Sequence, residues 1–191
     1  MIKTIAIAVV VLLVVSLGAV LAYAASKPDT FRVQRATSIK APAEKIFALL
    51  NDLRAQASWS PFEKDPNMKR THSGAPQGVG AVYEWDGNRE VGAGRIAITE
   101  STPPFRIALA LDMIRPFAAH NVVEFTLEPR GDLTGVTWAM HGRQPYLVKI
   151  MSTFIDCDAM VGREFERGLA NLKSLAEGQA VAATASAPGA R

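Results

Sequence analysis

Residues 146–177 read YLVKIMSTFIDCDAMVGREFERGLANLKSLAE, and their spacing predicts one long amphipathic helix. Apolar side chains recur at steps of three and four residues, and most charged side chains lie off this stripe. The stripe consists of Leu147, Ile150, Phe154, Val161, Phe165, Leu169, Leu172 and Leu175. At about 1.5 Å per residue the helix would span roughly 45 Å. It can bury its apolar face only against a large partner, which must come from the preceding sequence.

That partner is predicted to be a sheet, because the upstream residues alternate between apolar and polar side chains. Strands are expected at 31–39, 68–73, 79–86, 92–101, 105–113, 118–129 and 134–143. Short turns rich in glycine and proline separate the last six strands, so consecutive strands should pair antiparallel. Two short helices, at 42–50 and 53–57, should follow the first strand. The order predicts an α+β fold in which a curved antiparallel sheet of about six to seven strands wraps around the C-terminal helix.

An uncharged, aliphatic run of about 21 residues, 5–25, precedes the strands and is long enough to cross a membrane. Ala22-Tyr23-Ala24 also fits the small-x-small cleavage pattern of a signal peptide, although the run is longer than a usual signal core. Either alternative carries the domain across a membrane if the N-terminus stays inside, whereas the inverse orientation leaves it cytoplasmic. We expect a single-pass membrane protein with the domain on the extracytoplasmic side.

Composition divides the chain into four parts. Residues 1–25 form the anchor or signal-type segment, and residues 26–30 form a short polar linker. Residues 31–177 are long enough for one domain with a real core. Ala, Gly, Ser and Pro dominate residues 178–191, which we expect to be a disordered tail.

Charge and cysteine content exclude several classes of function. The formal net charge is only +3, and no cluster of Lys and Arg interleaved with aromatic residues is present. A nucleic-acid surface is therefore not expected. Cys157 is the only cysteine, which rules out an intramolecular disulfide and a multi-cysteine metal site. The sequence lacks HxH and HExxH spacing, so no metal and no other cofactor is predicted.

Few residues suggest catalysis. His72, His120 and His141 have no evident partner in the predicted strands. The Gly92-Ala-Gly94 segment lacks the flanking buried strand and helix of a dinucleotide-binding fingerprint. An enzyme would need a cavity residue with a perturbed pKa, and Tyr83 is the best candidate for it.

Three segments and the order of elements resemble a known family. They are Ile39-Lys-Ala-Pro-Ala-Glu-Lys-Ile-Phe47, Trp59-Ser60-Pro61-Phe62 and Gly78-Val-Gly80. Together with the closing helix they resemble polyketide cyclase/dehydrase-type proteins of the START-like, helix-grip superfamily, also called SRPBCC, over about residues 31–177. The resemblance implies a deep hydrophobic cavity between sheet and C-terminal helix that binds lipids, sterols, polyketides or other apolar molecules. It also implies that some members are cyclases or dehydratases.

Large side chains on the inward face of the strands and helix are predicted to line this cavity. They are Tyr83, Trp85, Leu109, Met113, Phe125, Trp138, Met140, Phe154 and Phe165. Arg35 shares an otherwise apolar face, and a buried cation needs a partner. It pairs with one of the domain's own carboxylates or orients the polar head of a ligand. Gly162 and Gly168 should make room in the helix for a ligand or for close contact with the sheet.

These features favour a membrane-tethered, non-catalytic binding protein for a hydrophobic small molecule or lipid. Two alternatives remain open. One is a cyclase- or dehydratase-like enzyme acting on an apolar substrate, and the other is a structural or partner-binding envelope domain with a closed cavity.

Overall fold

The computed structural model describes residues 2–178, and its elements follow the predicted order. The helices are α1 (Ile2–Ser26), α2 (Ala43–Asn51), the 3-10 helix η1 (Ala55–Ser58), α3 (Tyr146–Met151) and α4 (Cys157–Ala176). The strands are β1 (Thr30–Ile39), β2 (Lys69–Gly74), β3 (Ala81–Asp86), β4 (Ala93–Thr102), β5 (Arg106–Arg115), β6 (Ala119–Arg130) and β7 (Leu133–Arg143).

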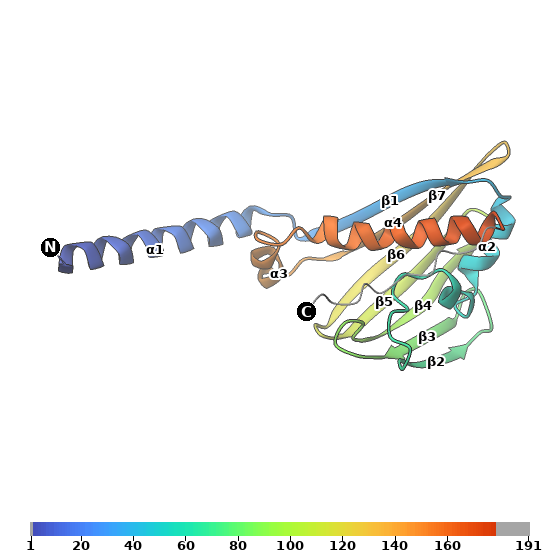
Figure 1. Cartoon of the computed structure of the whole chain (residues 1–191), viewed down its shortest axis with the longest axis horizontal. Coiled ribbons are helices and arrows are strands. Elements are labelled where there is room, and N and C mark those ends of the chain that lie inside the picture. The colour runs from blue at the N-terminus through green and yellow to red at the C-terminus, as the bar shows by residue number, and fades with distance from the viewer. Residues whose placement is uncertain (1, 179–191) are drawn as a thin grey trace, which may run out of the picture.

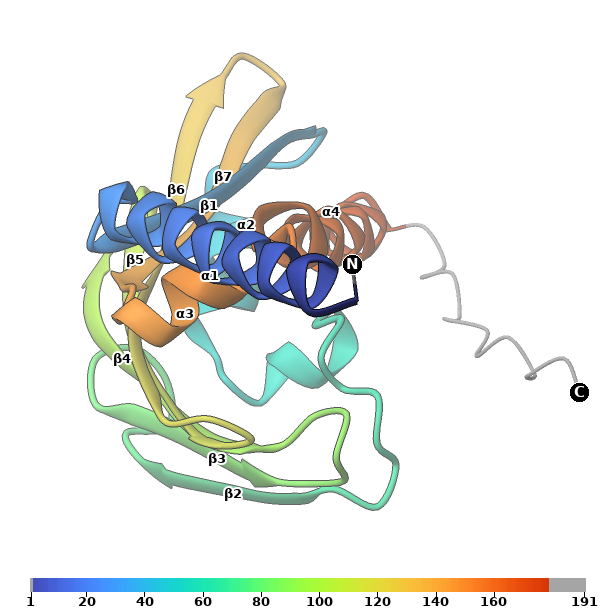
Figure 2. The same ribbon diagram turned by 90° about the vertical axis from the view of Figure 1, so that its left-hand side faces the viewer.

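All seven strands form one antiparallel sheet in the order β1-β7-β6-β5-β4-β3-β2. Strands β2 to β7 follow one another as a meander, and β1 pairs with β7 so that Val33 lies opposite Met140. The sheet curls strongly, bringing β2 and β3 round to face the side on which α4 lies (Figure 2). The predicted α+β fold, with a curved antiparallel sheet packed on the C-terminal helix, is therefore confirmed.

The prediction of one continuous helix over residues 146–177 is wrong. The helix is interrupted between Met151 and Cys157, and α3 turns away from the axis of α4 (Figure 1). The hydroxyl groups of Ser152 and Thr153 both donate to the Lys149 carbonyl at 3.0 Å, which competes with helical bonding. Asp156 then starts α4 as an N-cap, because its carboxylate accepts from the amide of Ala159 at 2.9 Å. Local capping outweighs the apolar spacing here.

Helix α4 packs along β1 and runs towards the C-terminal end of that strand (Figure 1). Its first turn lies beside Arg35, and its end lies beside Lys40, whose amide donates to the Glu177 carboxylate at 2.7 Å. Gly168 lets the helix approach the sheet closely, because a Cβ at this position would lie 2.6 Å from the Trp138 ring. Close contact with the sheet is thus the role of this glycine.

Helix α1 extends away from the domain as a long apolar rod (Figure 1). It is the one helix among residues 2–178 that is long and apolar enough to cross a membrane, with a mean hydropathy of 3.1 over its most apolar window. Its C-terminal end meets α3, where the Tyr146 hydroxyl donates to the Leu21 carbonyl at 2.9 Å. The buried Lys149 ammonium donates to the Lys27 carbonyl at 2.8 Å and to the Asp29 carboxylate at 2.6 Å. The predicted tail lies, apart from Gly178, outside the described residues.

Candidate functional site

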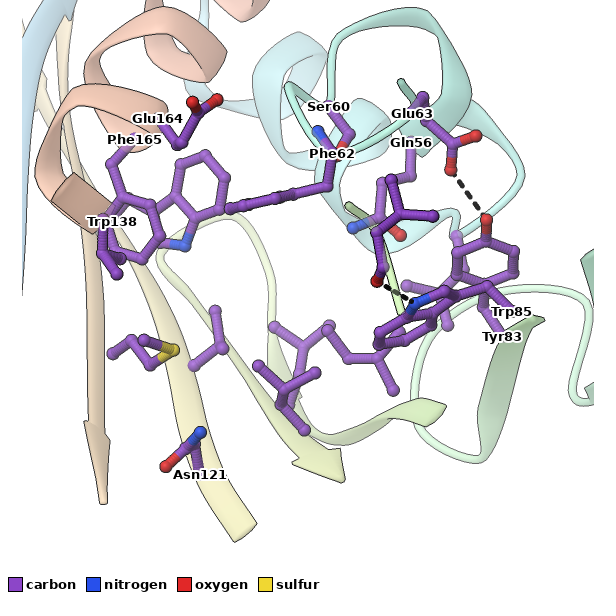
Figure 3. A pocket seen from close by; sticks show the side chains of 18 of the residues that line it. Gln56, Ser60, Phe62, Glu63, Tyr83, Trp85, Asn121, Trp138, Glu164 and Phe165 are labelled. Carbon is purple, nitrogen blue, oxygen red and sulfur yellow. Dashed lines mark hydrogen bonds between the residues drawn. The ribbon is translucent and has the colours of Figure 1, made fainter. Parts of the chain in front are cut away.

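A cavity of about 430 Å3 lies between the concave face of the sheet and α4 (Figure 3). Strands β3 to β7 form its floor, and the beginning of α4 forms one wall. The opposite wall comes from the end of α2 and the irregular segment 53–68. The lining is mostly apolar, as is typical of small-molecule sites.

Burial along the concave face changes from one end of the strands to the other. On β5, Ile107 is fully buried, but Leu111 is only half-buried. On β7, Val136 is fully buried, but Met140 is half-buried. We call the end that contains Ile107 and Val136, together with Leu172 of α4, the packed end. We call the end that contains Leu111 and Met140 the hollow end.

The break before α4 explains this difference. The first turn of α4 lies beside Arg35 of β1, to which Asp158 is bound at 2.9 Å. Helix α3, which would have continued the cover, packs against α1 instead. We attribute the cavity at the hollow end to this break in the helix.

Eight of the ten residues predicted to contact a ligand line this cavity. They are Tyr83, Trp85, Leu109, Met113, Phe125, Trp138, Met140 and Phe165. Trp85 lies flat over Gly94 on the floor, where a Cβ would come within 2.6 Å of its ring. Whether these side chains contact a ligand stays a prediction.

Arg35 lies outside the cavity lining. Its guanidinium binds Asp158 and Glu166 of α4, both at 2.9 Å, and these hydrogen bonds raise the pKa of Arg35. Gly162 provides the space, because a Cβ there would overlap the guanidinium. Of the two roles expected for Arg35, the structure shows the pairing with the domain's own carboxylates.

Phe154 also lies outside the lining. It falls in the break between α3 and α4, and 73% of its surface is exposed. The prediction placed it on the inner stripe of a continuous helix, and that helix does not exist.

Sequence reasoning missed the contribution of segment 53–68. Leu53, Gln56, Trp59, Phe62 and Glu63 all line the cavity from this segment. Apart from the four residues of η1, this segment is irregular, so it has no period that indicates which side chains point inward. One signal could have indicated this contribution: Trp59 and Phe62 are two aromatic residues within four positions of this segment.

The Tyr83 hydroxyl already has a hydrogen-bond partner. It donates to Glu63 at 2.7 Å, and the other oxygen of Glu63 is bound by Arg70 at 2.7 Å. Burial, followed by the hydrogen bond to Glu63, raises the pKa of Tyr83 above its ordinary value. At neutral pH this phenol therefore stays protonated and is a poor general base.

Several polar atoms in or beside the cavity wall have no hydrogen-bond partner, in contrast to the Tyr83 hydroxyl. The indole nitrogens of Trp59 and Trp138 and the Oε1 atom of Gln56 are buried and have no hydrogen-bond partner. The third indole, that of Trp85, donates to the Val91 carbonyl at 3.2 Å (Figure 3). Buried polar groups are normally paired, so the first three atoms call for an explanation.

The histidines lie elsewhere. His72, on the edge strand β2, stacks on Tyr83 with ring centroids 4.9 Å apart, and neither it, His120 nor His141 lines the cavity. His120 approaches Asp112 at 2.6 Å and is largely exposed. Residues 2–178 contain no group of three side chains placed to hold a metal ion.

Solved structures with the same fold come from varied organisms. The Aha1 dimer from Colwellia psychrerythraea is 17% identical, with a TM-score of 0.56 over 77% of this chain and 96% of that chain. A protein from Chromobacterium violaceum is 19% identical, with a TM-score of 0.54 over 78% and 99%. The major latex-like protein 151 from Panax ginseng is 12% identical, with a TM-score of 0.56 over 78% and 99%. At these identities the likeness shows the fold alone.

No curated protein sequence matches this chain. The family model described as polyketide cyclase / dehydrase and lipid transport matches residues 30–177, which is the whole sheet together with α2, α3 and α4. The chain therefore belongs to this START-like family, as the resemblance in its sequence predicted.

Proposed function

We propose that the domain binds one hydrophobic small molecule or lipid in the cavity and does not transform it. The observation that carries this proposal is the cavity of about 430 Å3 at the hollow end, with mostly apolar walls. Its size falls within the roughly 300–1,000 Å3 that is typical of small-molecule sites.

The polar groups around the cavity support binding rather than catalysis. General acid–base chemistry needs a group whose pKa lies near the working pH and which can reach the substrate. The Tyr83 hydroxyl is occupied by Glu63, and its pKa is raised. Glu63 is in turn held by Arg70, so this network is better suited to fixing the wall than to exchanging protons.

Native mass spectrometry of the protein purified from its own membranes tests the binding function. We expect an added mass of one small apolar molecule per chain, which is released by organic solvent and identified in the extract. A protein that carries no such mass, and that takes up none when incubated with total membrane lipid, would contradict the proposal.

We further infer that α1 remains attached and tethers the domain to a membrane. The support is a set of exposed apolar side chains at the end of the domain where α1 meets it. Leu147 and Phe154, in and after α3, are 68% and 73% exposed. Phe117, in the turn between β5 and β6, is 70% exposed and lies at the same end of the sheet, because β6 begins beside the end of β7.

The tether and its orientation are tested separately. The intact mass of the purified protein should include residues 1–25, and sodium carbonate should fail to extract it from membranes. We place the domain on the extracytoplasmic side, so protease added to the outside of sealed membrane vesicles of native orientation should digest it. A mass lacking this segment would identify a cleaved signal instead, and protection from protease would reverse the orientation.

A further inference from the structure

Large apolar side chains are exposed together in two short segments of the domain. Outside α1, most of those that the structure describes lie in residues 114–117, at the end of β5, or in residues 146–160, around the break before α4. We call this set the apolar rim, and its members are Ile114, Phe117, Tyr146, Leu147, Val148, Met151, Phe154, Ile155 and Met160. The others, such as Phe105 and Leu133, lie singly in other elements. Single exposed apolar side chains are ordinary, but a gathered set marks a contact surface.

Both segments lie at the end of the sheet from which α1 leaves. Strand β5 ends beside the start of β6, and β6 starts beside the end of β7, which leads into α3. The Tyr146 hydroxyl of α3 donates to the Leu21 carbonyl of α1 at 2.9 Å. Figure 2 looks onto this end of the domain, with α1 pointing towards the viewer. The apolar rim therefore surrounds the exit of the one helix that is apolar enough to cross a membrane among residues 2–178.

Polar contacts hold the junction between α1 and the domain. Lys149 of α3 is buried, and its ammonium donates to the Lys27 carbonyl at 2.8 Å and to the Asp29 carboxylate at 2.6 Å. The Lys27 ammonium donates to the Ser152 hydroxyl at 3.1 Å. Ala24, near the end of α1, has no exposed surface. These contacts fix the direction in which α1 leaves, so the domain presents one particular face to whatever surrounds α1.

The side chains at the junction are those that favour a membrane surface. Tyr23 is largely exposed, and the Lys27 ammonium lies 5.2 Å from the centre of its ring. Tyrosine and lysine concentrate where hydrocarbon meets water, because each has an apolar body and a polar end. Tyr146 is bonded to Leu21, so α3 lies at the level of these residues. The exposed Leu147, which follows Tyr146, is thereby held at the same level.

The apolar rim adjoins the cavity. Met160, in the first turn of α4, belongs to both, because it lines the cavity and is 51% exposed. Met113 and Met140 also line the cavity and lie near the ends of β5 and β7 that carry the rim. The hollow end of the cavity is therefore the end on the side of α1.

We propose that the apolar rim docks on the phospholipid bilayer that α1 crosses, so that the hollow end of the cavity faces the bilayer. This inference rests on the proposed binding function and tether, and it adds the partner surface of the same site. Docking removes the exposed rings of Phe117 and Phe154 from water, which is favourable at the boundary of a bilayer. An apolar ligand then moves between bilayer and cavity without crossing water.

Spin labels on single cysteines test the docking in the full-length protein, after Cys157→Ser removes the native thiol. Phe117→Cys and Phe154→Cys each add one site on the rim. Phe105→Cys and Leu133→Cys each add one exposed site beside the packed end. In phosphatidylcholine vesicles, relaxation by oxygen, which concentrates in hydrocarbon, is compared with relaxation by a water-soluble nickel complex. We expect oxygen to be the stronger relaxant at the two rim positions and the nickel complex to be the stronger at the other two.

Charged substitutions provide a matched control. Phe117→Asp combined with Phe154→Asp should lift the rim from the bilayer, so that a label on Leu147→Cys loses its protection from the nickel complex. Phe105→Asp combined with Leu133→Asp adds the same charge beside the packed end and should leave the label at 147 protected. All four phenylalanine and leucine positions are exposed, and thermal unfolding should confirm that both variants remain folded.

A label on Leu13→Cys, in the middle of α1, separates this inference from the tether. If the nickel complex reaches position 13, α1 does not cross the bilayer and the tether fails. If position 13 is protected while positions 117 and 154 are as open to the nickel complex as positions 105 and 133, the tether stands and the docking is overturned. The binding function is judged apart from both, by the mass of the bound molecule.

Discussion

The two ends of the sheet differ in how completely their inward-facing side chains are buried. At the packed end, Ile107 and Val136 have no exposed surface, and neither does Leu172 of α4. At the hollow end, Leu111 and Met140 continue the same inward faces but border a cavity. The strands have the same pattern at both ends, and we attribute the difference to the break before α4. The comparison teaches that a few capping residues outside the sheet decide how much of its concave face becomes a site.

The largest expected effect contrasts one side chain from each end. Leu172→Ala should lower the free energy of unfolding by about 2–5 kcal/mol, because it opens a void in close-packed surroundings. Met140→Ala should cost about 1 kcal/mol, because it merely enlarges an existing cavity. Chemical denaturation of the two variants measures the difference, and equal losses would show that the hollow end is packed after all.

The two glycines of α4 give a second contrast. A Cβ at Gly168 would meet the rigid rings of Trp138 and Pro61, so Gly168→Ala should destabilise by about 1–3 kcal/mol. A Cβ at Gly162 would meet the end of the longer Arg35 side chain. Gly162→Ala should therefore change stability by less than about 1 kcal/mol, since the gain in helix propensity offsets the displacement. Thermal unfolding ranks them, and a reversed order would refute the assignment of these contacts.

The break itself can be altered. Asp156→Ala should remove the N-cap of α4 and cost about 1 kcal/mol. Combined with Ser152→Ala and Thr153→Ala, it should favour helix across the break and reduce ligand uptake at the hollow end. Hydrogen exchange should then slow in residues 152–156. Ser58→Ala, which removes a hydroxyl bonded to the Ala55 carbonyl, is the control. Unchanged exchange in the triple variant would mean that other contacts hold the break.

The smallest expected effect concerns an ion pair on the outer face of the sheet, where electrostatic attraction rather than packing contributes to stability. The hydrogen bond from Arg106 to Glu124, at 2.5 Å, lowers the pKa of Glu124. A carboxylate with a depressed pKa contributes stability above its unfolded pKa of roughly 4.3, and that contribution is lost as the pH falls through the folded value. Glu124→Gln should therefore cost less than about 1 kcal/mol at pH 7 and nothing at low pH. A difference that persists at pH 2 would contradict this cause.

The sequence alone predicted the strands of the sheet, but it did not predict all of the residues that line the cavity. Alternation and turn residues located all seven strands to within about two residues, because the period of two is imposed by the pleat itself. The apolar stripe of residues 146–177 hid the break, because Phe154 and Ser152 fit a helical spacing as well as a loop. Arg35 illustrates a further limit, since its partners, Asp158 and Glu166, lie more than a hundred residues away. Segment 53–68 has no period, so its inward side chains could not be assigned.

The central claim is that the hollow end holds a hydrophobic molecule, and a pair of tryptophan substitutions tests it most directly. Leu111→Trp places a large ring inside the cavity, whereas Leu133→Trp places one at the exposed start of β7, far from the lining. Both proteins are purified from membranes and examined by native mass spectrometry. We predict that Leu133→Trp retains the bound molecule and that Leu111→Trp loses it while unfolding at a similar temperature. Equal retention by the two variants would contradict the account.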